Sequence, residues 1–346
     1  MKFGVEVPTA TAGMMYPVPF ATINDVVETA IEVEQLGYFD VAGNDHLSTM
    51  QFVREAWPTP PDYFEPLITL ANIAARTSVL RLTTGIIALP MRRPILLAKQ
   101  VATLDQLSGG RVTLGVAVGG YRDEFERVEP QLKDANRGAL VEETIAALRV
   151  LFEERHASYA GKYLRFQDIE TYPKPVQSPL PIYSGGNADG SIRRAAESCQ
   201  GWFPAKLGPE KIREGRAKLD KYARAAGRNP ATITTALQSV VCLGTTAEQA
   251  RETFMGSSFD LFRKSLQNTM MKNIDIDAYL RMNLVGSPAE VCAKVEAYQK
   301  AGVDHLAALL FVGNTVEEMR QQIRWFAREV LPVFADSDEG KKSAAH

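Results

Sequence analysis

Short apolar runs typical of buried β-strands alternate with amphipathic helical segments along this chain, and the alternation repeats eight times. The expected strands are 3–7, 38–42, 79–89, 112–118, 181–184, 201–204, 233–243 and 305–311. The expected helices are 22–36, 66–76, 94–107, 137–152, 188–198, 209–226 and 288–301, with a last helix that starts after Thr315. Because regular alternation favours a parallel sheet, and eight units favour a closed one, the sequence predicts an α/β fold with a single (β/α)8 TIM barrel. An open doubly wound sheet is the alternative.

Sequence signals at segment ends define the expected domain. Ser287 with Glu290, and Thr315 with Glu318, have the spacing of capping boxes at helix starts. The segment 247–283 interrupts the alternation after the seventh strand, and we expect it to be a helical insertion. We therefore expect one barrel domain over 1–335, followed by a flexible polar tail over 336–346.

Composition narrows the possible partners. A net charge of −2 gives no basic footprint, so we expect neither nucleic acid nor a membrane as a partner. The three cysteines are far apart and the four histidines lack metal-ligand spacing, so we expect no disulfide framework and no metal site. Together with the lack of a signal-peptide core at the N-terminus, this predicts a cytoplasmic protein.

In a (β/α)8 barrel the chemistry lies on the loops that follow the strands. His46 follows the second expected strand and is our candidate proton donor or general acid–base group, the alternative being a histidine that only caps its loop. Thr84 and Gly85 fall in the third strand, where glycine indicates either a close approach to a ligand or simple packing.

Two glycine-rich loops are candidates for binding a cofactor. Glycines expose backbone N–H groups, and a helix N-terminus attracts phosphate. The loop after the fourth strand suits an anion or the edge of a planar ring, and the loop after the fifth strand suits a phosphate; plain turns are the alternative in both. The candidate residues are Gly119, Gly120 and Tyr121 in the first loop, and Ser184, Gly185, Gly186, Asn187 and Ser191 in the second.

Apolar side chains in the first two loops are candidates for a substrate pocket. Met14 and Tyr16 follow the first strand, while Asn44 and Trp57 follow the second. Aromatic and apolar residues of this kind either line a ligand pocket or pack within their own loops.

A long stretch, Pro94–Arg111, carries the pattern A-x-x-x-A-T-L-D-Q-L-S-G-G-R and runs into the expected fourth strand. Further matching segments are 172–177, 181–186, 286–288 and 301–305. With these motifs the chain resembles the bacterial luciferase-like superfamily of flavin- or deazaflavin-dependent oxidoreductases, over roughly residues 1–330.

The resemblance implies a barrel with a flavin-type cofactor at its mouth. It implies a non-prolyl cis peptide at Gly85-Ile86, a phosphate loop after strand five and a pocket histidine at His46. Luciferases proper have an E-H-H loop, a reactive cysteine and an arginine where this chain has Asp45-His46-Leu47, Ala117 and Val118, so we do not expect light emission. Deazaflavin-dependent relatives commonly carry a tryptophan near Ser48-Thr49-Met50, and its absence favours FMN.

These expectations combine into one leading hypothesis, a two-component monooxygenase. Reduced FMN, delivered by a separate NAD(P)H-dependent flavin reductase, would react with O2 to give a C4a-peroxyflavin that oxygenates a small organic substrate, with 247–283 as a lid. The alternatives are a coenzyme F420 (deazaflavin)-dependent hydride-transfer enzyme, a barrel that binds flavin without turnover and, more remotely, a metal-dependent hydrolase. The resemblance further implies a homodimer formed through 66–76 and 94–107.

Overall fold

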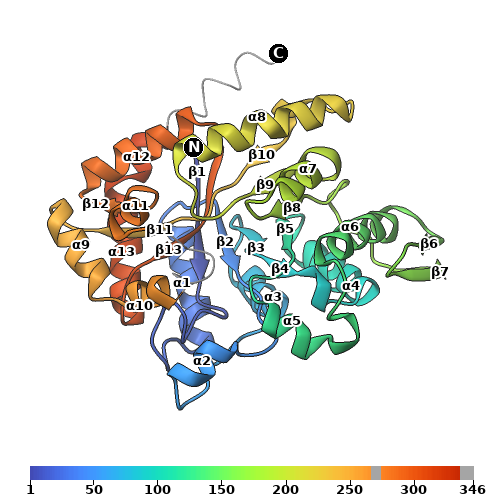
Figure 1. Cartoon of the computed structure of the whole chain (residues 1–346), viewed down its shortest axis with the longest axis horizontal. Helices are drawn as coiled ribbons and strands as arrows, with labels where there is room; N and C mark the ends of the chain where they lie inside the picture. Colours follow the sequence, from blue (N-terminus) through green and yellow to red (C-terminus); the bar gives the residue numbers. More distant parts are fainter. Residues whose placement is uncertain (266–273, 336–346) are drawn as a thin grey trace.

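The computed structural model describes residues 1–265 and 274–335 of the chain. One parallel sheet curls through the middle of the molecule and helices cover its outside (Figure 1). Its strands follow the order β10-β9-β8-β5-β3-β2-β1-β13-β11-β12, with β4 beside β5. Their bounds are β1 Lys2–Val7, β2 Asp40–Gly43, β3 Arg81–Thr84, β4 Ile87–Ala88, β5 Val112–Ala117, β8 Ile182–Gly185, β9 Gly201–Phe203, β10 Thr234–Thr235, β11 Val240–Leu243, β12 Leu284–Gly286 and β13 His305–Phe311. The α/β class and the parallel sheet are as predicted.

Residues 234–243 join the two arms of the curled sheet. On one side Ala236 N–H donates to the carbonyl of Trp202 in β9. On the other side Leu237 N–H donates to the carbonyl of His305, at the start of β13. The backbone here alternates its hydrogen bonds between two neighbouring strands, an arrangement consistent with the predicted barrel.

Two expected strands are interrupted. The expected strand 79–89 is wrong in its second half: β3 ends at Thr84, the Gly85–Ile86 peptide is cis, and a 3₁₀ turn, Leu89–Met91, follows the short β4. The expected strand 233–243 is divided into β10 and β11. The apolar pattern continues through both breaks because the residues stay buried where the pairing changes, so periodicity alone could not reveal them.

The helices lie close to their expected positions. The main ones are α1 Ile23–Gln35, α3 Pro66–Arg76, α4 Pro94–Ser108, α6 Arg137–Glu153, α7 Asp189–Ser198, α8 Pro209–Ala225, α12 Pro288–Lys300 and α13 Val316–Glu329. The capping box of Ser287 and Glu290 is confirmed. The one predicted at Thr315 is only half formed, because the Glu318 carboxylate accepts from Asn314 N–H instead of Thr315 N–H.

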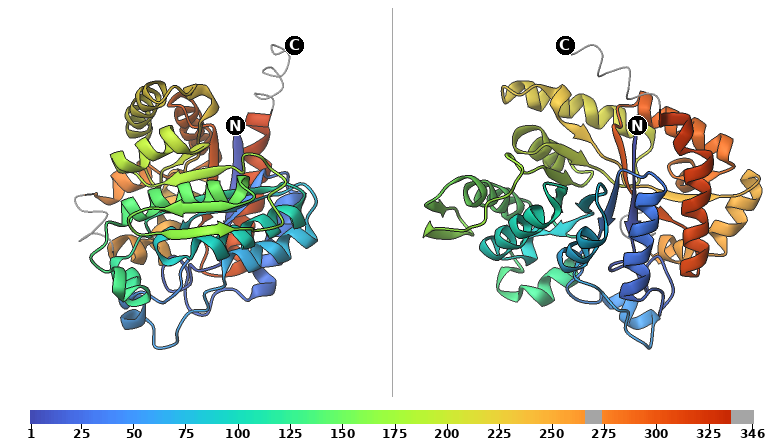
Figure 2. Two further views of the ribbon diagram at one scale, coloured as in Figure 1. Left: turned by 90° about the vertical axis from the view of Figure 1, so that its right-hand side faces the viewer. Right: turned by 180° about the vertical axis from the view of Figure 1, so that it is seen from behind.

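Several elements were not expected. They are helices α2 Gln51–Ala56, α5 Arg122–Val128 and α14 Leu331–Phe334, the 3₁₀ turns Pro130–Leu132 and Pro230–Thr232, strand β12, and the antiparallel hairpin of β6 Ala157–Ala160 and β7 Arg165–Ile169. The hairpin lies on the outside of the molecule and faces the viewer in the left panel of Figure 2. The described part of 247–283 contains α9 Ala247–Met255, α10 Ser258–Ser265 and α11 Ile276–Arg281. The predicted tail 336–346 lies outside the described residues.

Arg111, in the turn between α4 and β5, holds the N-terminal end of the sheet together. Its guanidinium donates to the carbonyls of Ala74 at 2.8 Å, Thr77 at 3.1 Å and Leu80 at 2.9 Å, and its Nε donates to the Ser108 carbonyl at 2.8 Å. These contacts satisfy carbonyls at the end of α3 that the helix cannot pair itself. The loops after the strands lie at the other end, near α2 and α5 in Figure 1.

Candidate active site

Two adjoining cavities open at the carboxyl ends of the strands. One has a volume of about 390 Å³ and the other about 560 Å³. Both are bordered by Gly85, Ile86, Gly119, Gly120, Asn187, Ala205 and Gln238. Because they share so much wall, they form one site with two parts. We call the smaller part, which His46 lines, the histidine cavity. We call the larger part, which Gly185 and Gly186 line, the glycine cavity.

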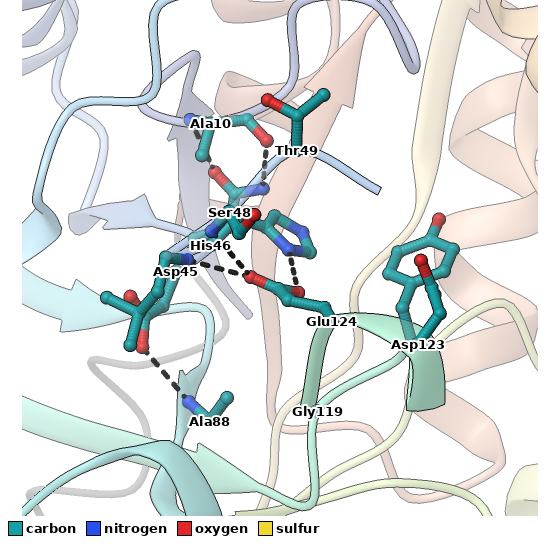
Figure 3. A network of polar contacts seen from close by, with 12 residues as sticks. Ala10, Asp45, His46, Ser48, Thr49, Ala88, Gly119, Asp123 and Glu124 are labelled. Carbon is teal, nitrogen blue, oxygen red and sulfur yellow. Dashed lines mark hydrogen bonds and ion pairs between the residues drawn. The ribbon is translucent and has the colours of Figure 1, made fainter. Parts of the chain in front are cut away.

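His46 lines the histidine cavity, and a buried carboxylate holds its ring. Nδ1 of His46 lies 2.8 Å from Oε2 of Glu124, whose side chain is only 2% exposed (Figure 3). The other oxygen, Oε1, accepts the backbone N–H of Leu47 at 2.7 Å and of Ser48 at 3.1 Å. An ionised carboxylate can only accept, so Nδ1 carries the proton in this contact and Nε2 is left to exchange a proton with a bound molecule.

Two tyrosines pack around the histidine. The rings of Tyr63 and Tyr121 each lie with their centroids 5.7 Å from that of His46. Burial, with a smaller contribution from the Glu124 charge, raises the pKa of both phenols well above the usual 10. Both groups therefore remain hydrogen-bond donors across the physiological pH range. Tyr121 is in the cavity wall, and its hydroxyl lies 3.7 Å from the sulfur of Met14.

The glycine cavity is shaped by close backbone approach. Gly185 and Gly186 end β8 and lead into the N-terminus of α7. A Cβ on Gly185 would lie 3.2 Å from Cγ2 of Ile86, and one on Gly186, which has φ of +118°, would lie 2.7 Å from Oγ of Ser191. Side chains at these two positions would narrow the cavity beside a helix end that suits a phosphate, so the glycines keep a cradle open there.

Asn187 fixes the position of this loop. Its amide nitrogen donates to the Ala205 carbonyl at 2.9 Å, and its amide oxygen accepts the Ala205 N–H at 3.0 Å. The loop after β8 is thereby tied to the loop after β9 by two reciprocal hydrogen bonds. The side chain of Asn187 thus serves the shape of the site, and its backbone borders both cavities.

Arg137 is a site residue that the sequence reasoning missed. It begins α6 and lines the glycine cavity, with Nη1 donating to the Gly119 carbonyl at 3.2 Å. Burial and the charge of Arg122 lower its pKa from the ordinary value, although a guanidinium stays charged. The only signal in the sequence was an arginine at the start of a helix close to the fourth strand, which is not distinctive.

A second missed group lies deep in the histidine cavity. Glu6 on β1 is 2% exposed, and Oε2 of its carboxyl accepts from the Gln238 amide at 2.6 Å. Burial raises the pKa of Glu6 to about 8, and burial lowers the pKa of Lys206, after β9, to about 8. A glutamate within an apolar strand was the available signal for Glu6. Lys206 and Gln238 had none, because only the fold brings them to the same wall.

Most of the predicted site residues lie together at this site. Those that line it are Met14, Asn44, His46, Gly85, Gly119, Gly120, Tyr121, Gly185, Gly186, Asn187 and Ser191. Asn44 braces the first loop, since its amide oxygen accepts from Ala10 N–H at 3.0 Å.

Four predicted residues are instead placed behind the cavity walls. The hydroxyl of Thr84 donates to the Gly115 carbonyl at 2.7 Å, and that of Ser184 donates to the Ser191 carbonyl at 3.1 Å. Tyr16 donates to the Phe311 carbonyl and Trp57 to the Gly13 carbonyl. Thr84 and Ser184 point away from the mouth because alternate side chains at a strand end face opposite sides, whereas Tyr16 and Trp57 lie on loops and bond to other segments of the chain.

Within residues 1–265 and 274–335, no group of three or more His, Cys, Asp or Glu side chains is arranged to hold a metal ion. The same part of the chain contains no helix of the length and apolar character that crossing a bilayer requires.

Comparison with known proteins gives a consistent result. The family model for luciferase-like monooxygenases matches residues 1–305. The chain is 26% identical to the FMNH2-dependent dimethylsulfone monooxygenase of Pseudomonas putida, over 80% of each chain. Among solved structures, a monooxygenase of Streptomyces bottropensis superposes with a TM-score of 0.78 at 24% identity, covering 96% of this chain and all of that one.

A coenzyme F420-dependent secondary alcohol dehydrogenase superposes almost as well, with a TM-score of 0.77 at 19% identity over 95% of this chain and 98% of that one. The two structural matches therefore show the shared fold, while the family model covers most of the chain and every predicted site residue. The chain belongs to the luciferase-like monooxygenase family.

Proposed function

We propose that this protein is a flavin-dependent monooxygenase that uses reduced FMN and O2 to oxygenate a small organic substrate. The observation that carries the proposal is the junction of the two cavities. His46, held by Glu124, lines one cavity, the glycine pair and α7 border the other, and the two cavities share part of their wall. A proton-exchanging side chain beside an open, phosphate-suited cradle is the arrangement that a flavin mononucleotide site requires.

The residues of the glycine cavity fit the two ends of FMN. The phosphate would lie against the N-terminus of α7, with Ser191 and the Arg137 guanidinium close by. The apolar part of the same wall, Ile86, Val118 and Phe203, suits a flat ring system. Gly120 leaves open space at the ring's edge, since a Cβ there would meet nothing within 4 Å.

His46 would act as the group that gives and takes the proton. Bound reduced flavin would supply the electrons with which O2 is activated. The protein's own contribution is then to keep water away and to place a proton donor at the reacting atoms. His46 can do this through Nε2, while Tyr121 offers a hydroxyl that burial keeps protonated.

The reduced cofactor would come from a separate NAD(P)H-dependent flavin reductase. The relative from Pseudomonas putida is named for its dependence on FMNH2, and no G-x-G-x-x-G follows the first strand of this chain. We further propose that helices in 247–283 cover the mouth during turnover. Phe262 of α10 and Ile274 already border the histidine cavity, although residues 266–273 lie outside the described part.

We also propose a homodimer that uses the outer face of α3 and α4. This face exposes three large apolar side chains, Ile68 at 67%, Leu96 at 59% and Leu107 at 65%. Apolar side chains grouped on neighbouring helices mark a surface that another protein covers.

Anaerobic titration of the protein with reduced FMN, and separately with reduced coenzyme F420, tests the function. We expect saturable FMN binding, followed on exposure to air by flavin oxidation that is sensitive to His46→Gln. Tight deazaflavin binding without FMN binding would instead favour hydride transfer. Flavin binding with oxygen-dependent rates that are identical in His46→Gln would favour a binding protein without turnover.

A further inference from the structure

Lys206 lines the histidine cavity and forms no ion pair among the described residues. It follows β9 with a left-handed backbone, φ of 53°, and its side chain lines the cavity. In the described part of the chain, its ammonium group has no ion pair and no hydrogen bond. Its Nζ lies over the ring of Phe262, 5.0 Å from the ring centroid. A partly buried ammonium without an anion is unfavourable unless a ligand supplies one.

The other charges around this cavity are already paired. Asp45 accepts from Arg92 at 2.5 Å, and Glu124 holds His46. On α10, which packs against Lys206 through Phe262, Asp260 is paired with Arg263 and Lys264. Glu6 on β1 is therefore the one acidic side chain lining this cavity whose charge acts on Lys206 without being taken up by another cation, and it forms no ion pair with Lys206 among the described residues.

Glu6 complements Lys206 at the same wall. Its Oε2 accepts from Gln238, while its Oε1 has no hydrogen-bond partner among the described residues. Burial raises the pKa of Glu6 to about 8, although the Gln238 hydrogen bond and the Lys206 charge act to lower it, so at pH 7 the protonated carboxyl, an O–H donor, is the more populated form. The Glu6 carboxyl, the Gln238 amide and the Lys206 ammonium thus present hydrogen-bond donors and a positive charge on one wall of the cavity.

The rest of the histidine cavity is apolar. Met14, Met15, Phe262 and Ile86 line it, and its volume of about 390 Å³ suits a small organic molecule. A ligand matched to this wall would carry an apolar body and one anionic end.

We propose that the substrate of this site is a small organic oxyanion, a carboxylate or sulfonate, whose charged end binds Lys206 and Glu6 with its apolar body toward Met14 and Met15. The proposal rests on the proposed function, because it names the class of substrate for that site. It assigns Lys206 and Glu6 a role in specificity. It leaves proton exchange at the reacting atoms to His46.

The two groups give the binding a defined pH dependence. Lys206, whose pKa burial lowers to about 8, is charged below that pH, and Glu6 is protonated below about 8. Both are in the binding form at pH 7, and both lose it as pH rises through about 8. Tyr16 also faces Glu6, but burial keeps its pKa far above this range. Anion affinity should therefore fall about 10- to 100-fold between pH 7 and pH 9.

Calorimetry or ligand-detected NMR on the flavin-free protein tests the proposal without turnover. The probes are hexanoate and hexanesulfonate, each compared with neutral hexanamide. We expect at least one anion to bind about 10- to 100-fold more tightly than the amide at pH 7. The anion that binds more tightly identifies the head group. Equal affinity for anions and amide would overturn the proposal.

Four variants separate the charge from the fold. Lys206→Met should abolish the preference for anions and Lys206→Arg should keep it, whereas Lys211→Met, at an exposed lysine paired with Glu214 on α8, should change nothing. Glu6→Gln keeps a donor at every pH, so it should retain binding at pH 7 but make the loss above pH 8 shallower. Retention of the anion preference in a folded Lys206→Met protein would contradict the assignment.

A parallel FMN titration distinguishes the two proposals. If FMN binds but anions and amides bind alike, only the substrate class is wrong. If anions bind through Lys206 while reduced FMN does not bind, the oxyanion site stands and the proposed cofactor is wrong.

Discussion

Nδ1 of His46 lies 2.8 Å from the carboxylate of Glu124, which also accepts the two backbone N–H groups that follow the histidine. A single buried side chain thus sets the ring orientation and the shape of its loop. Glu124 comes from α5, after β5, and His46 comes from the loop after β2. The acid–base group is therefore positioned by a distant part of the chain and does not depend on its own loop alone.

Glu124→Gln should lower turnover with little change in flavin affinity. The amide can still contact the ring, but its NH2 group can donate as well as its oxygen accept, so it no longer fixes the orientation of the imidazole. Loss of this orientation should reduce the rate about 10- to 100-fold. Steady-state oxygen consumption and flavin titration measure the two effects separately. Glu126→Gln on the same helix, at an exposed residue paired with Arg122, is the control and should resemble the original protein.

Arg137→Met should weaken FMN binding without weakening riboflavin binding. Both flavins have the same ring, and only FMN carries the phosphate that we place beside the guanidinium. Loss of one charge-assisted contact should reduce FMN affinity about 10- to 100-fold. Flavin fluorescence titration measures both constants, with Arg155→Met in the exposed hairpin as the control. An equal loss for the two flavins would show that Arg137 does not act on the phosphate.

Two helical glycines should respond oppositely to alanine. In α8 a Cβ on Gly215 would lie 2.2 Å from Cη2 of the buried Trp202, so Gly215→Ala should destabilise the protein by about 1–3 kcal/mol. In α7 a Cβ on Gly190 would meet nothing within 4 Å, so Gly190→Ala should stabilise it by about 0.5–1 kcal/mol. Urea unfolding followed by circular dichroism gives both values. A change of the same sign in the free energy of unfolding of both variants would contradict the packing argument.

Glu34 should make stability depend on pH in the acid range. Burial alone would raise its pKa, but hydrogen bonds from the backbone N–H groups of Val79, Leu80 and Ser78 outweigh it and lower the pKa from its ordinary value. With a depressed folded-state pKa, the stabilisation is present above the unfolded-state pKa and is lost as pH falls through the folded-state one.

Glu34→Gln should therefore cost about 1 kcal/mol at pH 7, a value reduced by the partial exposure of the carboxylate, and less at pH 3. Chemical denaturation at the two pH values measures the difference. A cost that is independent of pH would rule out the charge as its origin.

Leu96→Lys should convert a dimer to a monomer. A charged side chain on the exposed apolar face of α3 and α4 would have to be buried in the dimer without a partner. Light scattering should show twice the chain mass of 38.1 kDa for the original protein and the single mass for the variant. Leu261→Lys, at an exposed leucine on α10, is the comparison, and the proposal fails if the original protein is already monomeric.

The sequence was sufficient for the repeating architecture and for most of the cavity wall. Periodic apolar patterns and helix-end signals placed the long helices to within a residue or two, because they are local properties, but they did not reveal the short helices α2, α5 and α14. The strand pattern missed the end of β3 at Thr84 and the switch within 234–243, since burial persists while the hydrogen-bond partner changes, although the cis peptide expected at Gly85–Ile86 from the resemblance is confirmed. Glu6, Lys206 and Gln238 were missed for a related reason. Glu6 lies at least 200 residues from the other two along the chain, Lys206 and Gln238 have no local signature, and only closure of the sheet brings the three together.

Arg111 belongs to the stretch by which the chain most resembles its family, yet it lies at the end of the sheet opposite the cavities. Its guanidinium bonds to main-chain carbonyls of α3 and of the segment before β3, so it secures helix placement whatever molecule occupies the mouth. These bonds form far from the cavities, so a change in the lining side chains can alter which ligand binds without disturbing how α3 is seated.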